Sequence, residues 1–127
     1  RQRQMCIRDG SEGLAAVAVC RDLGFAAAPR SALGTAVRFT LHLLAAAAPG
    51  GALEVRVPPF AAIQCLPGPA HRRGTPPSVV ETDPVTWLSV ALGDASWADA
   101  LASGAVVASG RRADLAELLP LHLPPVP

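Results

Sequence analysis

The longest regular hydrophobic pattern in this chain has a helical period and runs through residues 31–48. Its apolar positions recur every three or four residues, at Leu33, Val37, Leu41, Leu44 and Ala48. Such a stripe predicts an amphipathic helix. Phe39 and Leu43 place further apolar surface beside the stripe, so we expect this helix to be covered on more than one face. The Pro-Gly-Gly sequence at 49–51 ends it.

Four segments have the patterns of β-strands. Residues 52–57 alternate apolar and polar side chains, which is typical of a strand with one buried face. Residues 60–66 are apolar almost throughout and predict a more central strand. A third strand is expected at 78–82 and a short fourth one at 106–109. A Pro-Gly-Pro turn and a polar, proline-containing loop occupy 67–77, between the second and third strands.

Two shorter helices are predicted from their capping residues. Asp83 is a good N-cap for a helix over 83–92, and the proline that follows it loses no hydrogen bond in the first turn. Ser96 can cap a helix over 96–103, which the glycine at position 104 ends. A last helical turn is expected at 114–119, because an aspartate and a glutamate there have capping-box spacing.

The first 29 residues are harder to interpret. Residues 1–9 look like the conceptual translation of an adapter sequence used in library preparation, and we exclude them from fold reasoning. A genuine basic N-terminal arm is the alternative. Residues 10–29 are rich in alanine; 14–20 fit a helix, but Gly24 and Pro29 interrupt the segment. The expected division is an artefact at 1–9, an uncertain N-terminal segment at 10–29, a domain at 30–123 and a tail at 124–127.

Together these elements predict a single α+β domain, in which helices cover one face of a mostly antiparallel sheet of about four or five strands. The formal net charge is +1. Residues 1–9 carry three arginines and one aspartate, so the charge without them is −1. A charge this small lacks the basic footprint of a nucleic-acid-binding protein, and no nucleic-acid partner is expected.

The sequence also argues against a membrane span, a disulfide framework and a metal site. The longest apolar run, at 33–48, is interrupted by Arg38 and His42 and is too short to cross a bilayer. Outside the first nine residues only Cys20 and Cys65 remain, without a CxxC motif, which favours a reduced, cytoplasmic protein. The histidines are scattered, at His42, His71 and His122. We therefore expect no metal and no cofactor.

Several motifs of the central and C-terminal parts point to a known family. The longest are Glu-Val-Arg-Val-Pro-Pro at 54–59, Arg-Gly-Thr-Pro-Pro at 73–77 and Val-Val-Glu-Thr-Asp-Pro at 79–84. Shorter matches lie at 64–65, 68–69, 71, 86–88, 97–100, 103–104, 108–110 and 112–115. Over residues 36–121 the chain resembles the small actinobacterial sterol carrier family proteins, which are bacterial orthologs of the sterol carrier protein (SCP). Ser78 departs from the asparagine expected there.

The resemblance implies an SCP-like fold, which is associated with binding sterols, fatty acids or acyl-CoA in an apolar tunnel beside the sheet. It therefore implies a non-enzymatic domain with a lipid or acyl-CoA ligand. Because a fold does not fix a function, a second interpretation stays open. In it, the same fold has a closed core and serves as a protein-interaction or scaffold module without a lipid ligand.

The apolar side chains of the helices and strands have two interpretations. The candidates for lining a lipid cavity are Val57, Phe60, Ile63, Trp87, Leu88, Trp97, Leu101 and Leu115. A lipid chain among them would gain about 0.8 kcal/mol for each buried methylene. The alternative is that these side chains fill the core, since an empty cavity costs a small domain about 24 cal/mol per Å³.

The loop before the third strand contains the basic candidates His71, Arg72 and Arg73. Guanidinium groups there would suit a phosphate, a carboxylate or the surface of a protein partner. A solvated charged loop is the alternative. Cys65 and His71 are close enough in sequence to suggest a thiol and its base, but Cys65 belongs to the most apolar strand and is expected to be inert.

Overall fold

The computed structural model describes residues 2–68 and 78–124, with side chains from residue 10 onward. Within these ranges the elements are, in chain order, α1 (Gln2–Leu23), the 3-10 helix η1 (Phe25–Ala27), α2 (Arg30–Ala47), β1 (Leu53–Val57), β2 (Ala61–Cys65), β3 (Ser78–Thr82), α3 (Pro84–Ala91), α4 (Trp97–Ser103) and β4 (Val106–Ser109). The predicted helices that correspond to α2, α3 and α4 and the four predicted strands are confirmed. The last helical turn is a single hydrogen-bonded turn, in which Leu119 N–H donates to Leu115 O at 3.1 Å.

The sheet formed by the described residues has the strand order β2-β1-β3-β4. β1 pairs with β2 and β3 with β4 in antiparallel fashion, whereas β1 and β3 are parallel. The prediction of a mostly antiparallel sheet is therefore wrong, because the sheet is mixed. Parallel neighbours need a long connection between them. Here that connection contains β2 itself, an arrangement that hydrophobic patterns cannot indicate.

The second predicted strand also lies at a different place in the sheet. Its apolar composition suggested a central strand, but β2 is an edge strand. Its helix-side residue Cys65 is buried, while Ala62 and Gln64 on the other face are exposed. α2 packs over β2, and this cover explains the apolar sequence of an edge strand.

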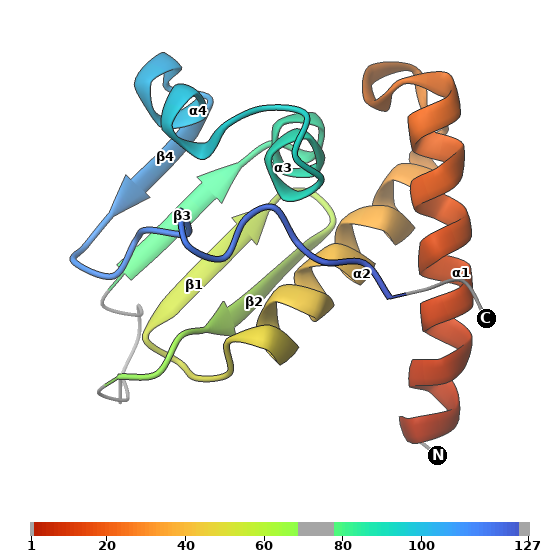
Figure 1. Cartoon of the computed structure of the whole chain (residues 1–127), viewed down its shortest axis with the longest axis horizontal. Coiled ribbons are helices and arrows are strands. Elements are labelled where there is room, and N and C mark those ends of the chain that lie inside the picture. The colour runs from red at the N-terminus through yellow and green to blue at the C-terminus, as the bar shows by residue number, and fades with distance from the viewer. Residues whose placement is uncertain (1, 69–77, 125–127) are drawn as a thin grey trace.

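The helices cover one face of the sheet in two layers. α2 contacts β2 and α3, and α1 packs on α2, so that α2 lies between α1 and the sheet (Figure 1). The alternation of β1 follows from this cover, because Leu53, Val55 and Val57 are buried while Glu54 and Arg56 are not fully covered. α2 is thus enclosed from two sides, as its wide apolar surface predicted.

The deepest part of the core joins α3 to α2 through a polar contact. Trp87 is fully buried, and its Nε1–H donates to Thr40 Oγ1 at 2.8 Å. The Thr40 hydroxyl in turn donates to the Ala36 carbonyl at 2.8 Å. Both buried polar groups are therefore satisfied without water.

The capping residues act as the sequence predicts. Asp83 Oδ2 accepts a hydrogen bond from Thr86 N at 3.0 Å, and Ser96 Oγ accepts one from Asp99 N at 3.0 Å. At the end of α4, Gly104 has φ +83°, the left-handed conformation that glycine adopts without strain. These local signals fix where the two short helices begin and where α4 ends.

α1 is a packed helix, although the sequence left residues 10–29 uncertain. Ala16, Val17 and Cys20 are buried. The Phe39 ring of α2 lies directly against the α1 backbone at Gly13, where a Cβ atom would overlap with the ring. α1 includes residues 2–9. The adapter origin of residues 1–9 stays a prediction, because a helical conformation does not show where a sequence comes from.

The C-terminal end of α1 is fixed to the turn that follows α3. Arg21 forms an ion pair with Asp94 at 3.2 Å and donates a hydrogen bond to the Leu92 carbonyl at 3.1 Å. Gly24 and Pro29, which interrupt the helical pattern in the sequence, mark the end of α1 and the start of α2. The two helices thereby form an antiparallel pair joined by η1.

Two glycines of α1 provide a test of how α1 packs against Phe39 of α2. A Cβ atom added at Gly10 would have no other atom within 4 Å, so Gly10→Ala should stabilise the protein by up to about 1 kcal/mol through helix propensity. Gly13→Ala should instead destabilise it, because Phe39 must move away from α1. Urea unfolding of both variants measures the difference, and an equal gain in both would contradict the packing of Phe39 on α1.

The Trp87–Thr40 contact can be tested by a double-mutant cycle. Thr40→Val keeps the shape of the side chain but removes the acceptor of the indole N–H, so it should lower the free energy of unfolding by about 1–3 kcal/mol. In a Trp87→Phe background the same exchange should cost less, because no N–H is then left unpaired. Equal costs in the two backgrounds, measured by urea unfolding, would show that the hydrogen bond contributes nothing.

Candidate functional site

The structure gathers most of the predicted cavity-lining residues into one packed cluster. Val57, Trp87, Leu88 and Leu115 are fully buried, and Trp97 is 8% exposed. All five belong to the same hydrophobic core. A ligand among them would have to displace side chains that already contact one another.

The other three predicted residues lie at the margin of the core or outside it. Phe60 and Ile63 are half-buried and pack against its edge. Leu101 is 37% exposed on α4 and does not belong to the cluster. A lining role for the eight residues stays a prediction. Because the core side chains are packed together, open space for a ligand is more readily found at the surface.

The two tryptophans differ in their polar contacts. The Trp87 N–H is paired with Thr40, whereas the buried Nε1 of Trp97 has no hydrogen-bond partner among the described residues. Trp97 is thus held by apolar packing alone. Nothing in the structure explains the unpaired N–H.

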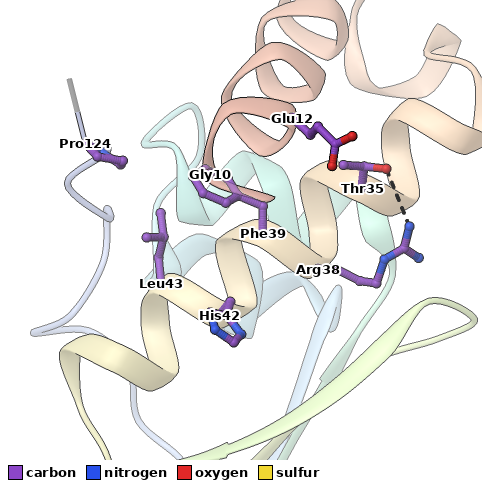
Figure 2. A pocket seen from close by; sticks show the side chains of 8 residues that line it. All are labelled: Gly10, Glu12, Thr35, Arg38, Phe39, His42, Leu43 and Pro124. Atoms are coloured by element: carbon purple, nitrogen blue, oxygen red, sulfur yellow. Dashed lines mark hydrogen bonds between the residues drawn. The ribbon is translucent and has the colours of Figure 1, made fainter. Parts of the chain in front are cut away.

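A half-open groove of about 600 Å³ lies between α1 and α2. Its lining residues are Gly10, Glu12, Thr35, Arg38, Phe39, His42, Leu43 and Pro124 (Figure 2). A volume of this size is typical of small-molecule sites, which mostly measure about 300–1,000 Å³.

α2 supplies one continuous wall of the groove because of its helical period. Thr35, Arg38, Phe39 and His42 lie at positions i, i+3, i+4 and i+7 and therefore share one face of the helix. Among the described residues, α1 supplies the opposite wall through Gly10 and Glu12. The C-terminal segment, whose Leu121 N–H donates to the Ala91 carbonyl at 2.8 Å, brings Pro124 to the apolar end.

The chemistry of the groove changes along its length. Figure 2 shows Phe39, Leu43 and Pro124 toward one end, with His42 beside them, and Glu12, Thr35 and Arg38 toward the other. Arg38 Nη2 donates a long hydrogen bond of 3.5 Å to Thr35 Oγ1. Neither Glu12 nor Arg38 takes part in an ion pair among the described residues.

Sequence reasoning missed this groove, although its residues carried a signal. Phe39 and Leu43 were recognised as apolar surface outside the main stripe, and Arg38 and His42 as interruptions of an apolar run. Together they describe an amphipathic second face of the same helix. The partner wall was not identified because the alanine-rich segment that forms it has no clear pattern.

A second, widely open recess of about 500 Å³ lies at the turn between β1 and β2. Its lining residues are Arg56, Pro58, Pro59, Phe60, Ala61, Ala62 and Glu81. Arg56 is already paired with Glu54, and the Arg30 guanidinium lies 5.2 Å from the centre of the Phe60 ring. The other charged lining residue, Glu81, takes part in no ion pair among the described residues.

The basic candidates His71, Arg72 and Arg73 lie outside the described residues. Both ends of their loop are held by Arg112, whose Nη1 donates to the Pro67 carbonyl at 2.6 Å and whose backbone N–H donates to Ser78 Oγ at 2.9 Å. Ser78, where the resemblance led us to expect asparagine, thus provides an acceptor that anchors the segment after β4.

The cysteines are not placed for nucleophilic chemistry. Cys20 and Cys65 are both buried and form no disulfide. Burial raises the pKa of the Cys65 thiol to about 11 and also raises the pKa of Cys20. Because the thiolate is the reactive form, this shift lowers the expected reactivity of Cys65 at neutral pH. In the described part of the chain, no group of three or more histidine, cysteine or acidic residues could hold a metal ion.

The domain has an α+β fold in which helices cover one face of the sheet, and a groove lies on its surface. Residues 29–121 match the family model described as bacterial SCP ortholog, and the chain belongs to this family. A search of curated proteins found no match. The matched range begins at the N-terminus of α2, so that α1 and its wall of the groove lie outside it. None of the described helices is both long enough and apolar enough to cross a membrane.

Burial of Cys65 makes a testable difference to its reactivity. In a Cys6→Ser, Cys20→Ala background, Cys65 should resist iodoacetamide in the folded protein and react fully in urea. The unfolded thiol has a pKa near its ordinary value of 9.0, whereas the folded one has a pKa of about 11. The burial of the protonated Cys65 thiol should therefore leave the free energy of unfolding unchanged below about pH 9. Between pH 9 and 11 the free energy of unfolding should decrease, because only the unfolded thiol loses its proton there. Rapid labelling of the folded protein would contradict the burial.

Proposed function

We propose that this chain is a non-enzymatic carrier-type domain that binds the hydrocarbon part of a lipid, sterol or acyl ligand. Membership of the bacterial SCP ortholog family supports the proposal. The single observation that carries it is the half-open groove with an apolar end formed by Phe39, Leu43 and Pro124. The free buried cysteines are in keeping with the proposed cytoplasmic location.

The groove suits a hydrocarbon chain better than the space between sheet and helices does. A chain inside the core would have to displace Trp87 and break its hydrogen bond to Thr40. It would also separate Leu88 and Leu115 from the other core side chains. The groove requires no such rearrangement, because its volume is already open to solvent.

The size of the groove is also sufficient for useful affinity. Each methylene removed from water contributes about 0.8 kcal/mol, so a segment of roughly eight methylenes gains about 6 kcal/mol before the cost of association. The polar residues at the other end would then select among head groups. This division between an apolar floor and few polar contacts is common in ligand sites.

Binding by native mass spectrometry tests the proposal with four probes: a fatty acid, a sterol, an acyl-CoA and a lysophospholipid with a zwitterionic head group. Delipidated protein should bind at least one of them. Leu43→Gln, which places an amide on the groove wall, should weaken that binding by about tenfold. Val107→Gln is the matched control, because Val107 is 64% exposed on β4 and does not line the groove. Absence of all binding, or equal weakening by both variants, would refute the proposal.

A closed core also supports a second candidate, a protein-interaction or scaffold module without a lipid ligand. Full burial of Trp87, Leu88 and Leu115 favours it. The partner surface proposed for it, around His71, Arg72 and Arg73, lies outside the described residues. The binding measurement separates the two functions, because only the carrier function requires a ligand in the groove.

A further inference from the structure

The polar end of the groove carries two opposite charges on opposite walls. Glu12 belongs to α1 and Arg38 to α2, and both line the same groove. Figure 2 shows Thr35 between them, with its hydroxyl accepting the hydrogen bond from Arg38. Neither charge takes part in an ion pair among the described residues, and both line the groove that a ligand would enter.

These charges lie next to the apolar end rather than apart from it. Phe39 directly follows Arg38 on α2, and Leu43 is one further turn along the same helix. An amphiphile whose chain covers Phe39 and Leu43 therefore brings its head group to Arg38 and Glu12. The order of the lining residues thus fixes the direction in which such a molecule lies.

We propose that the groove binds a zwitterionic amphiphile, with the anionic group of its head on Arg38 and its ammonium group on Glu12. This inference rests on the proposed carrier function and names its ligand class. A guanidinium binds a phosphate or carboxylate through two parallel hydrogen bonds. A carboxylate accepts hydrogen bonds from an ammonium group. A head that carries both groups satisfies both walls at once.

Ligands with other head groups fit these walls less well. A simple carboxylate on Arg38 would bring a like charge into the groove that Glu12 lines, and like charges repel. A neutral head would remove water from Glu12 and Arg38 without replacing their hydrogen bonds, which costs free energy. The pair of charges therefore selects against fatty acids and sterols as well as in favour of zwitterions.

The test compares three probes of equal chain length: a lysophosphatidylethanolamine, a fatty acid and a monoacylglycerol. Dissociation constants are measured below their micellar concentrations for the wild type, Glu12→Gln and Arg38→Gln. The zwitterion should lose about tenfold in affinity in each variant. The fatty acid should lose affinity in Arg38→Gln and gain it in Glu12→Gln. The monoacylglycerol should be unaffected by Arg38→Gln or Glu12→Gln, or bind slightly better.

Matched controls are Glu117→Gln and Arg111→Gln, which change exposed charges outside the groove and should leave all three constants unchanged. The response of the zwitterion to Glu12→Gln decides the inference. Unchanged or tighter binding would overturn it while leaving the carrier function intact. Failure of every probe to bind the folded wild type would overturn the carrier function itself. Thermal unfolding of each variant verifies that it is folded.

Discussion

The hydrogen bond between Trp87 and Thr40 is the constraint around which the domain is arranged. It lies in the deepest part of the core, where an unpaired indole N–H would be costly. The bond requires α3 to lie at a fixed position on α2, and both helices then cover the same face of the sheet. Around Trp87, core side chains of the helices and the sheet pack against one another. A ligand between the helices and the sheet would have to displace them, and a lining role for these side chains stays a prediction.

The groove proposed as the ligand site lies on α2, which is apolar on more than one face. Its first face supplies Val37, Leu41 and Leu44 to the core, and its second face supplies Phe39 and Leu43 to the groove. At Gly13 the α1 backbone lies directly against Phe39, while the groove beside this contact stays open. The groove therefore lies between two packed helices and not within the core.

The elements that could be predicted from sequence are those fixed by local interactions. Asp83 and Ser96 cap their helices through contacts three residues away, so the pattern around them is sufficient. The parallel pairing of β1 with β3 depends on the path of the chain over more than twenty residues, and no local signal carries it. The groove is harder still, because Glu12 and Arg38 are brought together only by helix packing. Sequence patterns identified Phe39 and Leu43 as apolar, but not what they face.

The two walls of the groove differ in their relation to the family. The wall formed by Phe39, Leu43 and Arg38 lies inside the matched range, whereas Gly10 and Glu12 lie before residue 29. The core depends on α2, α3 and the sheet, while the exposed side chain of Glu12 contributes little to stability. A change at that position can therefore alter the charge of the groove without altering the fold. In the proposed binding mode, the family domain would provide the surface for the hydrocarbon chain, and α1 would set which head group is accepted.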